Sequence, residues 1–250
     1  MADASELAKV LDAALREKRE IAPLTQTYGD YDLNLAYEAQ AHGIALRRER
    51  GEKIVGYKMG LTSEAKRKQM NLGAPIYGVL TDTMRVDSEL KVSEGVHPKV
   101  EPEIAFVTAR ELRGRITRDQ AFAALRSVAP ALEILDSRFT GFKYFSLPDV
   151  VADNASSFRF VLGPVQPPRD VAGLRMTMRV DGKTRQETDS NAISGHPLES
   201  LVQLVGMLPH PLPAGSIVLA GAATAAEPLR PGMHVELQVE GLGTVSLSCT

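Results

Sequence analysis

The sequence of 250 residues contains no tryptophan and a single cysteine, Cys249, beside the C-terminus. One cysteine cannot form a disulfide within the chain, so the sequence does not fit a disulfide-stabilised secreted domain and indicates a reducing compartment. Only 5% of the residues are aromatic, which argues against a surface on which nucleic-acid bases would stack. From these shortages we expect a cytoplasmic protein.

The sequence also has no large excess of charge of one sign. It contains 29 Lys and Arg and 31 Asp and Glu, which gives a net charge of −2. Proteins that bind the phosphate backbone usually carry a basic patch, so we expect no nucleic-acid partner. The longest apolar run, at residues 217–226, covers about half of a membrane span, and residues 1–20 lack the apolar stretch of a secretory signal. With 44% hydrophobic residues, the chain is expected to be a globular protein that binds no membrane and acts on a small molecule.

Several common catalytic motifs are absent as well. The sequence has no Gly-x-Ser-x-Gly elbow, no Walker loop and no Gly-x-Gly-x-x-Gly, so neither serine hydrolase chemistry nor nucleotide binding is indicated. The five histidines are scattered and form no His-Glu-x-x-His motif, which argues against a zinc site.

The N-terminal part has the patterns of two amphipathic helices, at residues 5–19 and 32–50. A strand at residues 53–59 and a short polar helix at residues 64–70 follow. The second helix ends in a basic tail that matches the negative end of the helix dipole, and we expect this tail to be solvated; it comprises Arg47, Arg48 and Arg50.

Beyond Asp82 the patterns of strands dominate, at residues 100–107, 132–135, 158–162, 174–180, 217–220 and 234–239. Asp181-Gly182 and Gly241-Leu242-Gly243 are typical of turns between strands. Two helices interrupt this part, one starting at the capping box of Thr117 and Gln120 and one near residues 197–207. We therefore expect an N-terminal α/β region over residues 1–80 and a β-rich core over residues 81–250, together forming one folded unit.

The most informative segment is His-Pro-Lys-Val-Glu-Pro-Glu-Ile at residues 97–104. Side chains alternate between the two faces of a strand, so Glu101 and Glu103 point the same way. Like charges side by side are unfavourable unless a cation or a shared proton compensates them. A third acid, Glu133, lies in an otherwise apolar strand, where a lone carboxylate also requires a partner. The three glutamates can therefore form one site for a hard divalent cation, Mg²⁺ or Mn²⁺.

Each candidate also has a purely structural interpretation. A Glu-x-Glu pair is more often the solvent face of a half-covered sheet. Lys58, near the end of an apolar strand, fits either a cation placed for an oxyanion or an edge-strand lysine. Asp153 and Asn154 precede a strand and fit an Asx turn, and His196 before a proline fits a helix-capping turn.

Five motifs together resemble the fumarylacetoacetate hydrolase superfamily, and within it the hydratase/decarboxylase branch of catechol meta-cleavage pathways. They are Lys-Met-Gly-Leu-Thr-Ser at 58–63, Pro-Ile-Tyr-Gly at 75–78, His-Pro-Lys-Val-Glu-Pro-Glu-Ile at 97–104, Ala-Leu-Glu-Ile-Leu-Asp-Ser-Arg at 131–138 and Val-Ala-Asp-Asn-Ala-Ser-Ser at 151–157. The resemblance covers the chain from about residue 30 to the end. It implies an α+β fold with the superfamily's mixed β-roll core and an N-terminal helical and α/β region.

The resemblance also implies roles for particular residues. The superfamily's metal ligands fall on Glu101, Glu103 and Glu133, with Mg²⁺ or Mn²⁺ as the expected cofactor. Its active-site lysine falls on Lys58. The remaining catalytic positions, which would orient water or substrate, fall on Asp153 and Asn154.

Two activities of the branch compete. Decarboxylases remove CO₂ from 4-oxalocrotonate (2-oxohex-3-enedioate), and hydratases add water to 2-hydroxypenta-2,4-dienoate. Hydratases carry an acid where this chain has Ile76, and water addition needs proton transfers, so the aliphatic residue favours decarboxylation. The Thr224-Ala225-Ala226 segment also resembles the decarboxylases. A non-catalytic subunit that supports an active partner, and a C–C hydrolase acting on acylpyruvates, are further alternatives.

The resemblance implies partners too. A small dicarboxylate 2-oxo acid is the expected substrate. Homo-oligomers are usual in the superfamily, and a complex with the companion hydratase of the pathway is a further expectation.

Overall fold

A computed structural model describes residues 3–62, 75–142 and 146–250, and the helix expected at residues 64–70 lies outside them. The described helices are α1 (Ala4–Glu17), α2 (Leu24–Tyr28), α3 (Leu33–Glu49), α5 (Arg118–Ala123), α6 (Leu147–Ala152) and α7 (Pro197–Met207). The strands are β1 (Ile54–Gly60), β2 (Ile76–Thr81), β3 (Glu89–Leu90), β4 (Lys99–Thr108), β5 (Leu125–Leu135), β6 (Ser157–Leu162), β7 (Arg175–Val180), β8 (Lys183–Asp189), β9 (Ile217–Leu219), β10 (Glu227–Pro228), β11 (His234–Val239) and β12 (Gly243–Cys249).

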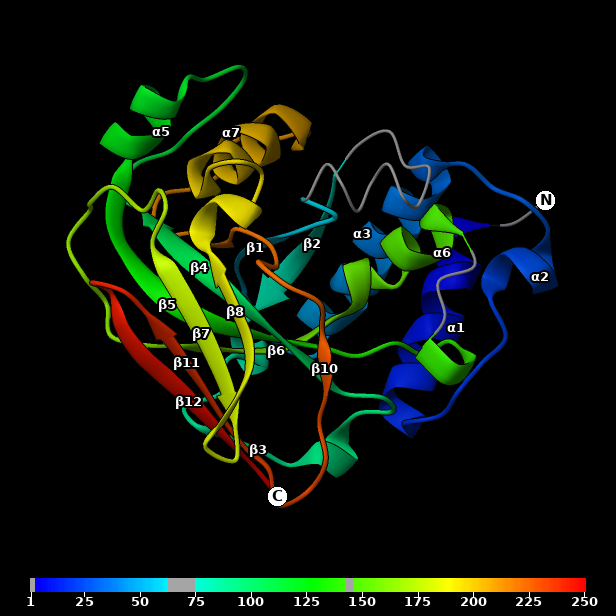
Figure 1. Cartoon of the computed structure of the whole chain (residues 1–250). Helices are drawn as coiled ribbons and strands as arrows, with labels where there is room; N and C mark the ends of the chain where they lie inside the picture. The colour runs from blue at the N-terminus through cyan, green and yellow to red at the C-terminus, as the bar shows by residue number, and fades with distance from the viewer. Residues whose placement is uncertain (1–2, 63–74, 143–145) are drawn as a thin grey trace.

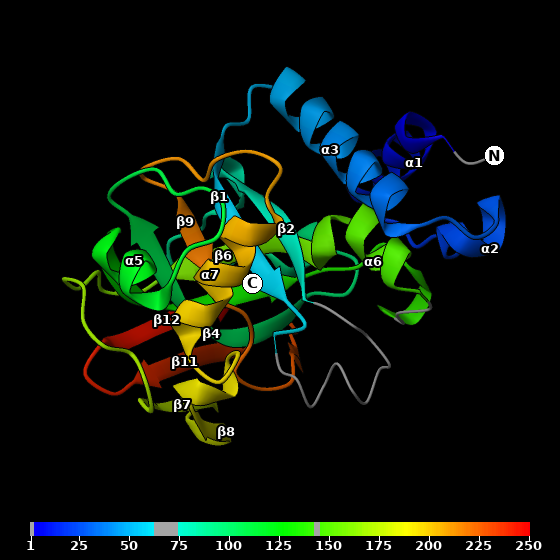
Figure 2. The same cartoon turned by 90° about the horizontal axis from the view of Figure 1, so that it is seen from above.

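The N-terminal helices form a layer with α6 on one side of the molecule (Figure 2). The first two expected helices are confirmed as α1 and α3, and each begins at an aspartate whose side chain accepts a hydrogen bond from a backbone N–H of the first turn, Asp3 and Asp32. Buried side chains of both helices pack against α6, among them Leu7, Leu11 and Ala36.

A seven-stranded sheet forms the centre of the molecule (Figure 1). Its strands follow the order β2-β1-β9-β4-β5-β6, with β10 paired to β4. The two ends of this path approach each other, because the backbone N–H of Val86, shortly after β2, donates to the carbonyl of Phe160 in β6 at 3.0 Å. The sheet is therefore strongly curled, and its inner face carries the small and apolar side chains Leu80, Met84, Ala105, Ala131, Phe160, Ile217 and Leu219.

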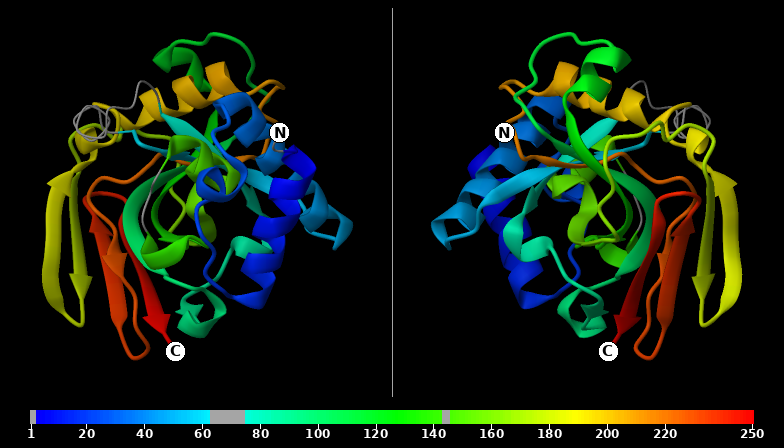
Figure 3. Two further views of the ribbon diagram at one scale, coloured as in Figure 1. Left: turned by 90° about the vertical axis from the view of Figure 1, so that its right-hand side faces the viewer. Right: turned by 90° about the vertical axis from the view of Figure 1, so that its left-hand side faces the viewer.

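A second, five-stranded sheet of order β3-β12-β11-β7-β8 packs against the outside of the curled sheet. Figure 3 shows the helical layer and this second sheet on opposite sides of the curled sheet. The turn expected at Asp181-Gly182 joins β7 to β8, and the turn at 241–243 joins β11 to β12. The expected α+β organisation is thus confirmed. No described helix is both long and apolar enough to cross a bilayer.

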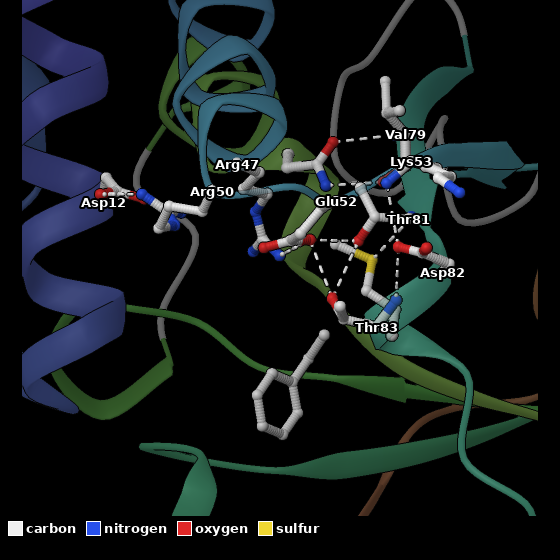
Figure 4. Close-up of polar contacts among 12 residues, drawn as sticks. Asp12, Arg47, Arg50, Glu52, Lys53, Val79, Thr81, Asp82 and Thr83 are labelled. Atoms are coloured by element: carbon white, nitrogen blue, oxygen red, sulfur yellow. Dashed lines mark hydrogen bonds and ion pairs between the residues drawn. The ribbon is translucent and has the colours of Figure 1, made fainter.

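The basic end of α3 differs from the expectation of a solvated tail. Arg47 is buried, and its Nη1 lies 3.5 Å from Glu52 Oε2 (Figure 4). The same carboxylate oxygen accepts hydrogen bonds from the hydroxyls of Thr81 at 2.5 Å and Thr83 at 2.8 Å, at the end of β2. Arg50 is also engaged, in a two-pronged ion pair with Asp12 of α1. The expectation of a solvated tail is therefore wrong for Arg47, which joins α3 to the sheet, whereas Arg48 and Arg50 are exposed as expected.

A second polar junction ties the segment before α3 to α6. Asp149, which is 1% exposed, accepts hydrogen bonds from the backbone N–H of Thr25 at 3.0 Å, the Thr25 hydroxyl at 2.6 Å and the Tyr31 hydroxyl at 2.7 Å. Hydrogen bonds to a buried charged acceptor are among the stronger ones in proteins.

We predict that Asp149→Ala lowers the free energy of unfolding by about 2–4 kcal/mol, because three donors lose their buried acceptor. Urea titration followed by circular dichroism measures the change, and the exposed Asp30 of the same segment provides Asp30→Ala as the matched control. If the helical layer and the sheets unfold as one unit, the variant keeps a single transition at lower urea. A second transition, or equal midpoints for the two variants, would contradict this view.

Candidate metal centre

Three glutamates meet on the inner face of the curled sheet because of the pairing of β4 with β5. Glu101 and Glu103 project from the same face of β4, and Glu101 is the direct antiparallel partner of Glu133 in β5. Each of the three offers a carboxylate oxygen, and these oxygens lie within 4.8 Å of one another. The strand periodicity and the pairing register are sufficient to produce this convergence.

The local environment fits a cation. Glu103 is 0% exposed and Glu133 is 1% exposed, whereas Glu101 is partly exposed. Among the described residues, no hydrogen-bond donor reaches Oε1 of Glu103 or Oε2 of Glu133. Buried carboxylate oxygens without donors are costly, and several hard oxygen ligands at one point are typical of Mg²⁺ or Mn²⁺ sites.

Lys58 of β1 supplies the nearby positive charge. Its ammonium lies 3.1 Å from Glu133 Oε1, and the residue is 3% exposed. Burial lowers the pKa of this ammonium, but attraction to the three glutamates outweighs burial, so the pKa lies above its ordinary value. Lys58 is therefore a buried, charged lysine and not an edge-strand lysine in solvent, since β1 lies between β2 and β9.

The cluster disfavours the charged form of its most buried member. Burial raises the pKa of Glu103 well above its ordinary value, and repulsion by Glu133 raises it further. A divalent cation among the three carboxylates would offset both the burial and the repulsion.

The loop after β9 closes the cluster from another side. The backbone N–H of Gly221 donates to Glu103 Oε2 at 2.8 Å, and it fixes that carboxylate. Gly221 has a φ of +106°, and a Cβ there would lie 2.5 Å from the Thr62 hydroxyl, so only glycine fits. Sequence reasoning missed Gly221, and its sole sequence signal is a glycine in an apolar stretch.

Asp153 and Asn154 lie in a buried turn, and their polar contacts are with the scaffold. The Asp153 carboxylate accepts from Nε of Arg138 at 2.5 Å, and burial raises its pKa to about 6 against the opposing attraction of this arginine. The Asn154 side chain accepts from the backbone N–H of Val79 in β2 at 2.8 Å and donates to the Val79 carbonyl at 2.9 Å. Their predicted contact with water or substrate remains a prediction.

The turn itself is conformationally unusual. Asn154, Ala155 and Ser156 all have positive φ values, of 51°, 51° and 59°. Non-glycine residues adopt this region rarely, so the surrounding contacts must hold it. Arg138 does so, because it also donates to the Asp153 carbonyl at 3.0 Å. This arginine was missed as a functional candidate, although it lies in the quoted motif at 131–138.

Two other candidates are placed clearly. Ile76 is 3% exposed, and a Cβ on its cross-strand partner Gly60 would lie 3.0 Å from Ile76 and 3.8 Å from Lys58 Nζ. Ile76 therefore lies on the same face of the β1–β2 pair as Lys58, diagonally across from it. His196 is the N-cap of α7, and its side chain accepts from the Leu198 N–H, which confirms the capping interpretation.

Comparison with known proteins identifies the family. The family model described as fumarylacetoacetate (FAA) hydrolase C-terminal matches residues 58–248. That match covers more than half of the chain, and the chain belongs to this family.

Individual relatives match over nearly their whole length. The chain is 45% identical to a 4-oxalocrotonate decarboxylase of Pseudomonas sp., covering 98% of each chain. It is 35% identical to a 2-hydroxyhexa-2,4-dienoate hydratase of Comamonas testosteroni, covering 95% of this chain and 94% of the relative. It superposes with a TM-score of 0.95 and 35% identity on a 4-oxalocrotonate decarboxylase from Pseudomonas putida G7 complexed with magnesium and adipate, covering 99% and 97% of the two chains. The expected fold of the superfamily is confirmed.

We predict that Glu103→Gln weakens cation binding without lowering the stability of the metal-free protein. After chelation, Glu103→Gln should melt at or above the temperature of the wild type, because the neutral amide relieves the repulsion in the cluster. MgCl₂ should stabilise the wild type, by about 2.7 kcal/mol at a hundredfold excess over the dissociation constant, and the variant much less. Thermal melts by circular dichroism measure both effects.

Glu111→Gln, at an exposed position, is the matched control and should respond to MgCl₂ as the wild type does. An equal response of Glu103→Gln and the wild type would show that the cation binds elsewhere.

Proposed function

We propose that this protein catalyses the metal-dependent decarboxylation of 4-oxalocrotonate to 2-hydroxypenta-2,4-dienoate, the enol form of 2-oxopent-4-enoate, and CO₂. The observation that carries the proposal is the convergence of three carboxylates beside a buried ammonium, in a chain whose full-length relatives include decarboxylases of this substrate. The relative complexed with magnesium and adipate, a six-carbon dicarboxylate, supports both the cation and the class of ligand.

In this proposal Glu101, Glu103 and Glu133 are the ligands of Mg²⁺ or Mn²⁺. When bound, the cation supplies Lewis-acid stabilisation for negative charge on the C2 oxygen of the substrate. Glu133 is oriented by its ion pair with Lys58, and Glu103 by the N–H of Gly221, so two of the ligands are held before a cation arrives. The partly exposed Glu101 marks the side from which substrate enters.

The reaction breaks the C5–C6 bond, and its electron pair forms a double bond between C4 and C5. The former C3–C4 double bond moves to C2–C3, negative charge reaches the C2 oxygen, and CO₂ leaves. Lys58 keeps a fixed positive charge beside this oxygen in a site from which water is largely excluded, where a charge acts more strongly than it would in water.

We assign Asp153 and Asn154 to positioning. Asn154 holds the backbone of β2 at Val79, and β2 is the strand paired with β1, which carries Lys58. Asp153 and Arg138 hold the turn that presents Asn154. Their influence on catalysis would therefore pass through the placement of Lys58.

Hydration is the second candidate, since relatives of 35% identity include a hydratase. The buried Ile76, on the same face of the β1–β2 pair as Lys58, favours decarboxylation, because it offers no proton-transfer group where the hydratases of the branch carry an acid. The complete set of three glutamates and Lys58 argues against a non-catalytic subunit and against loss of activity.

We further propose a cytoplasmic homo-oligomer that associates with the hydratase of the same pathway. The support is chemical, since the unstable dienol product of decarboxylation is the substrate of such a hydratase. The boundary between the regions 1–80 and 81–250 is proposed to lie within one folded unit, because Asn154 and Val79 are joined across it.

We predict that Lys58→Met lowers kcat by about 10²–10³, the loss typical of removing one transition-state charge stabiliser. The variant should still bind Mg²⁺, because its three carboxylate ligands remain. The assay follows the ultraviolet absorbance of 4-oxalocrotonate, with trapped CO₂ as the product measurement.

The control is Lys183→Met, at an exposed position of β8. Full activity in Lys58→Met would contradict the role of the lysine. Formation of 4-hydroxy-2-oxopentanoate from the dienoate, with no release of CO₂ from 4-oxalocrotonate, would instead identify a hydratase.

A further inference from the structure

The substrate proposed above carries a carboxylate at each end, and the glutamate cluster with its cation accounts for only one of them. The second carboxylate needs a positive group at a defined distance. In an extended six-carbon diacid, standard bond lengths separate the two carboxyl carbons by roughly 6 Å.

The burial of the cluster gives the direction in which the substrate extends. Along one face of β4, Glu103 is fully buried, Glu101 is partly exposed, and Lys99, the next residue on that face, is also partly exposed. The pairing of β4 with β5 is regular from Lys99 to Val107, so the alternation of faces is unbroken. Exposure along this face is therefore greater toward Lys99, whose Cα lies about 6–7 Å along the strand from that of Glu101.

The Lys99 side chain is held in place by an aromatic ring. Its Nζ lies 4.0 Å from the centroid of the Phe142 ring, which is 7% exposed. This contact is a cation–π interaction, and it positions the ammonium without neutralising its charge. Among the residues that the structure describes, no carboxylate forms an ion pair with Lys99, although His97, beside the same ring, is paired with Glu20.

Two buried cations of the described residues already have carboxylate partners. Lys58 is paired within the glutamate cluster, and Arg138 is bound to a buried aspartate. Within the described part of the chain, Lys99 is thus the half-buried cation left for an anionic ligand.

We propose that Lys99 binds the distal carboxylate of the substrate and so makes the site selective for 2-oxo diacids over 2-oxo monoacids. The inference rests on the proposed function, since the cation at the glutamates must hold the other end of the same molecule. The distal carboxylate is also the group that departs as CO₂. Its attraction to Lys99 is therefore stronger in the ground state than in the transition state, and Lys99 contributes to KM and not to kcat.

The test measures binding without turnover, using 2-oxoadipate and 2-oxohexanoate as probes on the Mg²⁺-loaded full chain by isothermal calorimetry. These compounds lack the C3–C4 double bond and differ only in the distal carboxylate. The wild type should bind 2-oxoadipate at least tenfold more tightly than 2-oxohexanoate. Lys99→Met should bind the two within about threefold of each other, with the affinity for 2-oxohexanoate unchanged, and Lys99→Arg should restore the preference.

With 4-oxalocrotonate, Lys99→Met should raise KM at least tenfold without lowering kcat. Lys183→Met is the control and should retain the preference of the wild type. Affinity for Mg²⁺ alone should not fall in Lys99→Met, which would rule out damage to the glutamate cluster as the cause.

The outcomes separate the inference from the proposed function. A Lys99→Met variant that keeps the preference for the diacid overturns the inference, as does a wild type without that preference. A wild type that releases no CO₂ and binds neither probe in the presence of Mg²⁺ overturns the proposed function itself.

Discussion

The repulsion among three carboxylates on the inner face of one sheet is the constraint on which the rest of this structure depends. Glu103 and Glu133 are almost without solvent, and Lys58 is the described cation paired with the cluster. Burying like charges in a medium of low dielectric is unfavourable, and a protein accepts such an arrangement where function requires it. Burial and repulsion by Glu133 both raise the pKa of Glu103, so the charged form of this carboxylate is disfavoured until a cation compensates it.

The strands and the turn around the site hold these charged side chains at fixed positions relative to one another. Regular antiparallel pairing sets Glu101 opposite Glu133, while β1, which carries Lys58, reaches β4 only through the short strand β9. The position of Lys58 therefore depends on β2, which pairs with β1. It also depends on the turn at residues 154–156 that holds β2, where three non-glycine residues have positive φ. Arg138 and Asp153 are both buried, and the ion pair between them holds this turn in place. Because an ion pair holds this strained turn, the turn has a fixed geometry. A site that acts through the positions of charged side chains requires such a fixed geometry.

Much of the fold and of the candidate site could be predicted from the sequence, wherever the residue pattern within a single strand or helix was sufficient. The alternation of Glu101 and Glu103 and the apolar setting of Glu133 predicted a shared site. The two long N-terminal helices were predicted from their apolar periodicity and the hairpin turns from their glycines, whereas the short helices α2 and α6 were not predicted. The missing parts depend on tertiary contacts. The strand β8 has no apolar residue in Lys-Thr-Arg-Gln-Glu-Thr-Asp, so its pattern resembles a loop, and pairing with β7 alone makes it a strand. Arg47 belongs to a basic run, yet a distant threonine pair and Glu52 convert it into a buried contact.

The net charge of −2 also acquires a different meaning from this arrangement. It suggested a chain with little electrostatic character, but the charges are unevenly distributed. Carboxylates gather at the buried end of one face of β4, and an ammonium that no described carboxylate pairs with lies at its more exposed end. On the proposed assignment, a divalent cation inverts the sign of the buried end, so that both ends of the face attract carboxylate groups. On the same assignment, a dianion is oriented along β4 by a positive charge at each end of this face, and overall charge contributes little to its capture. The preference for a diacid over a monoacid would then follow from the two separate cations, since a monoacid can use only one of them.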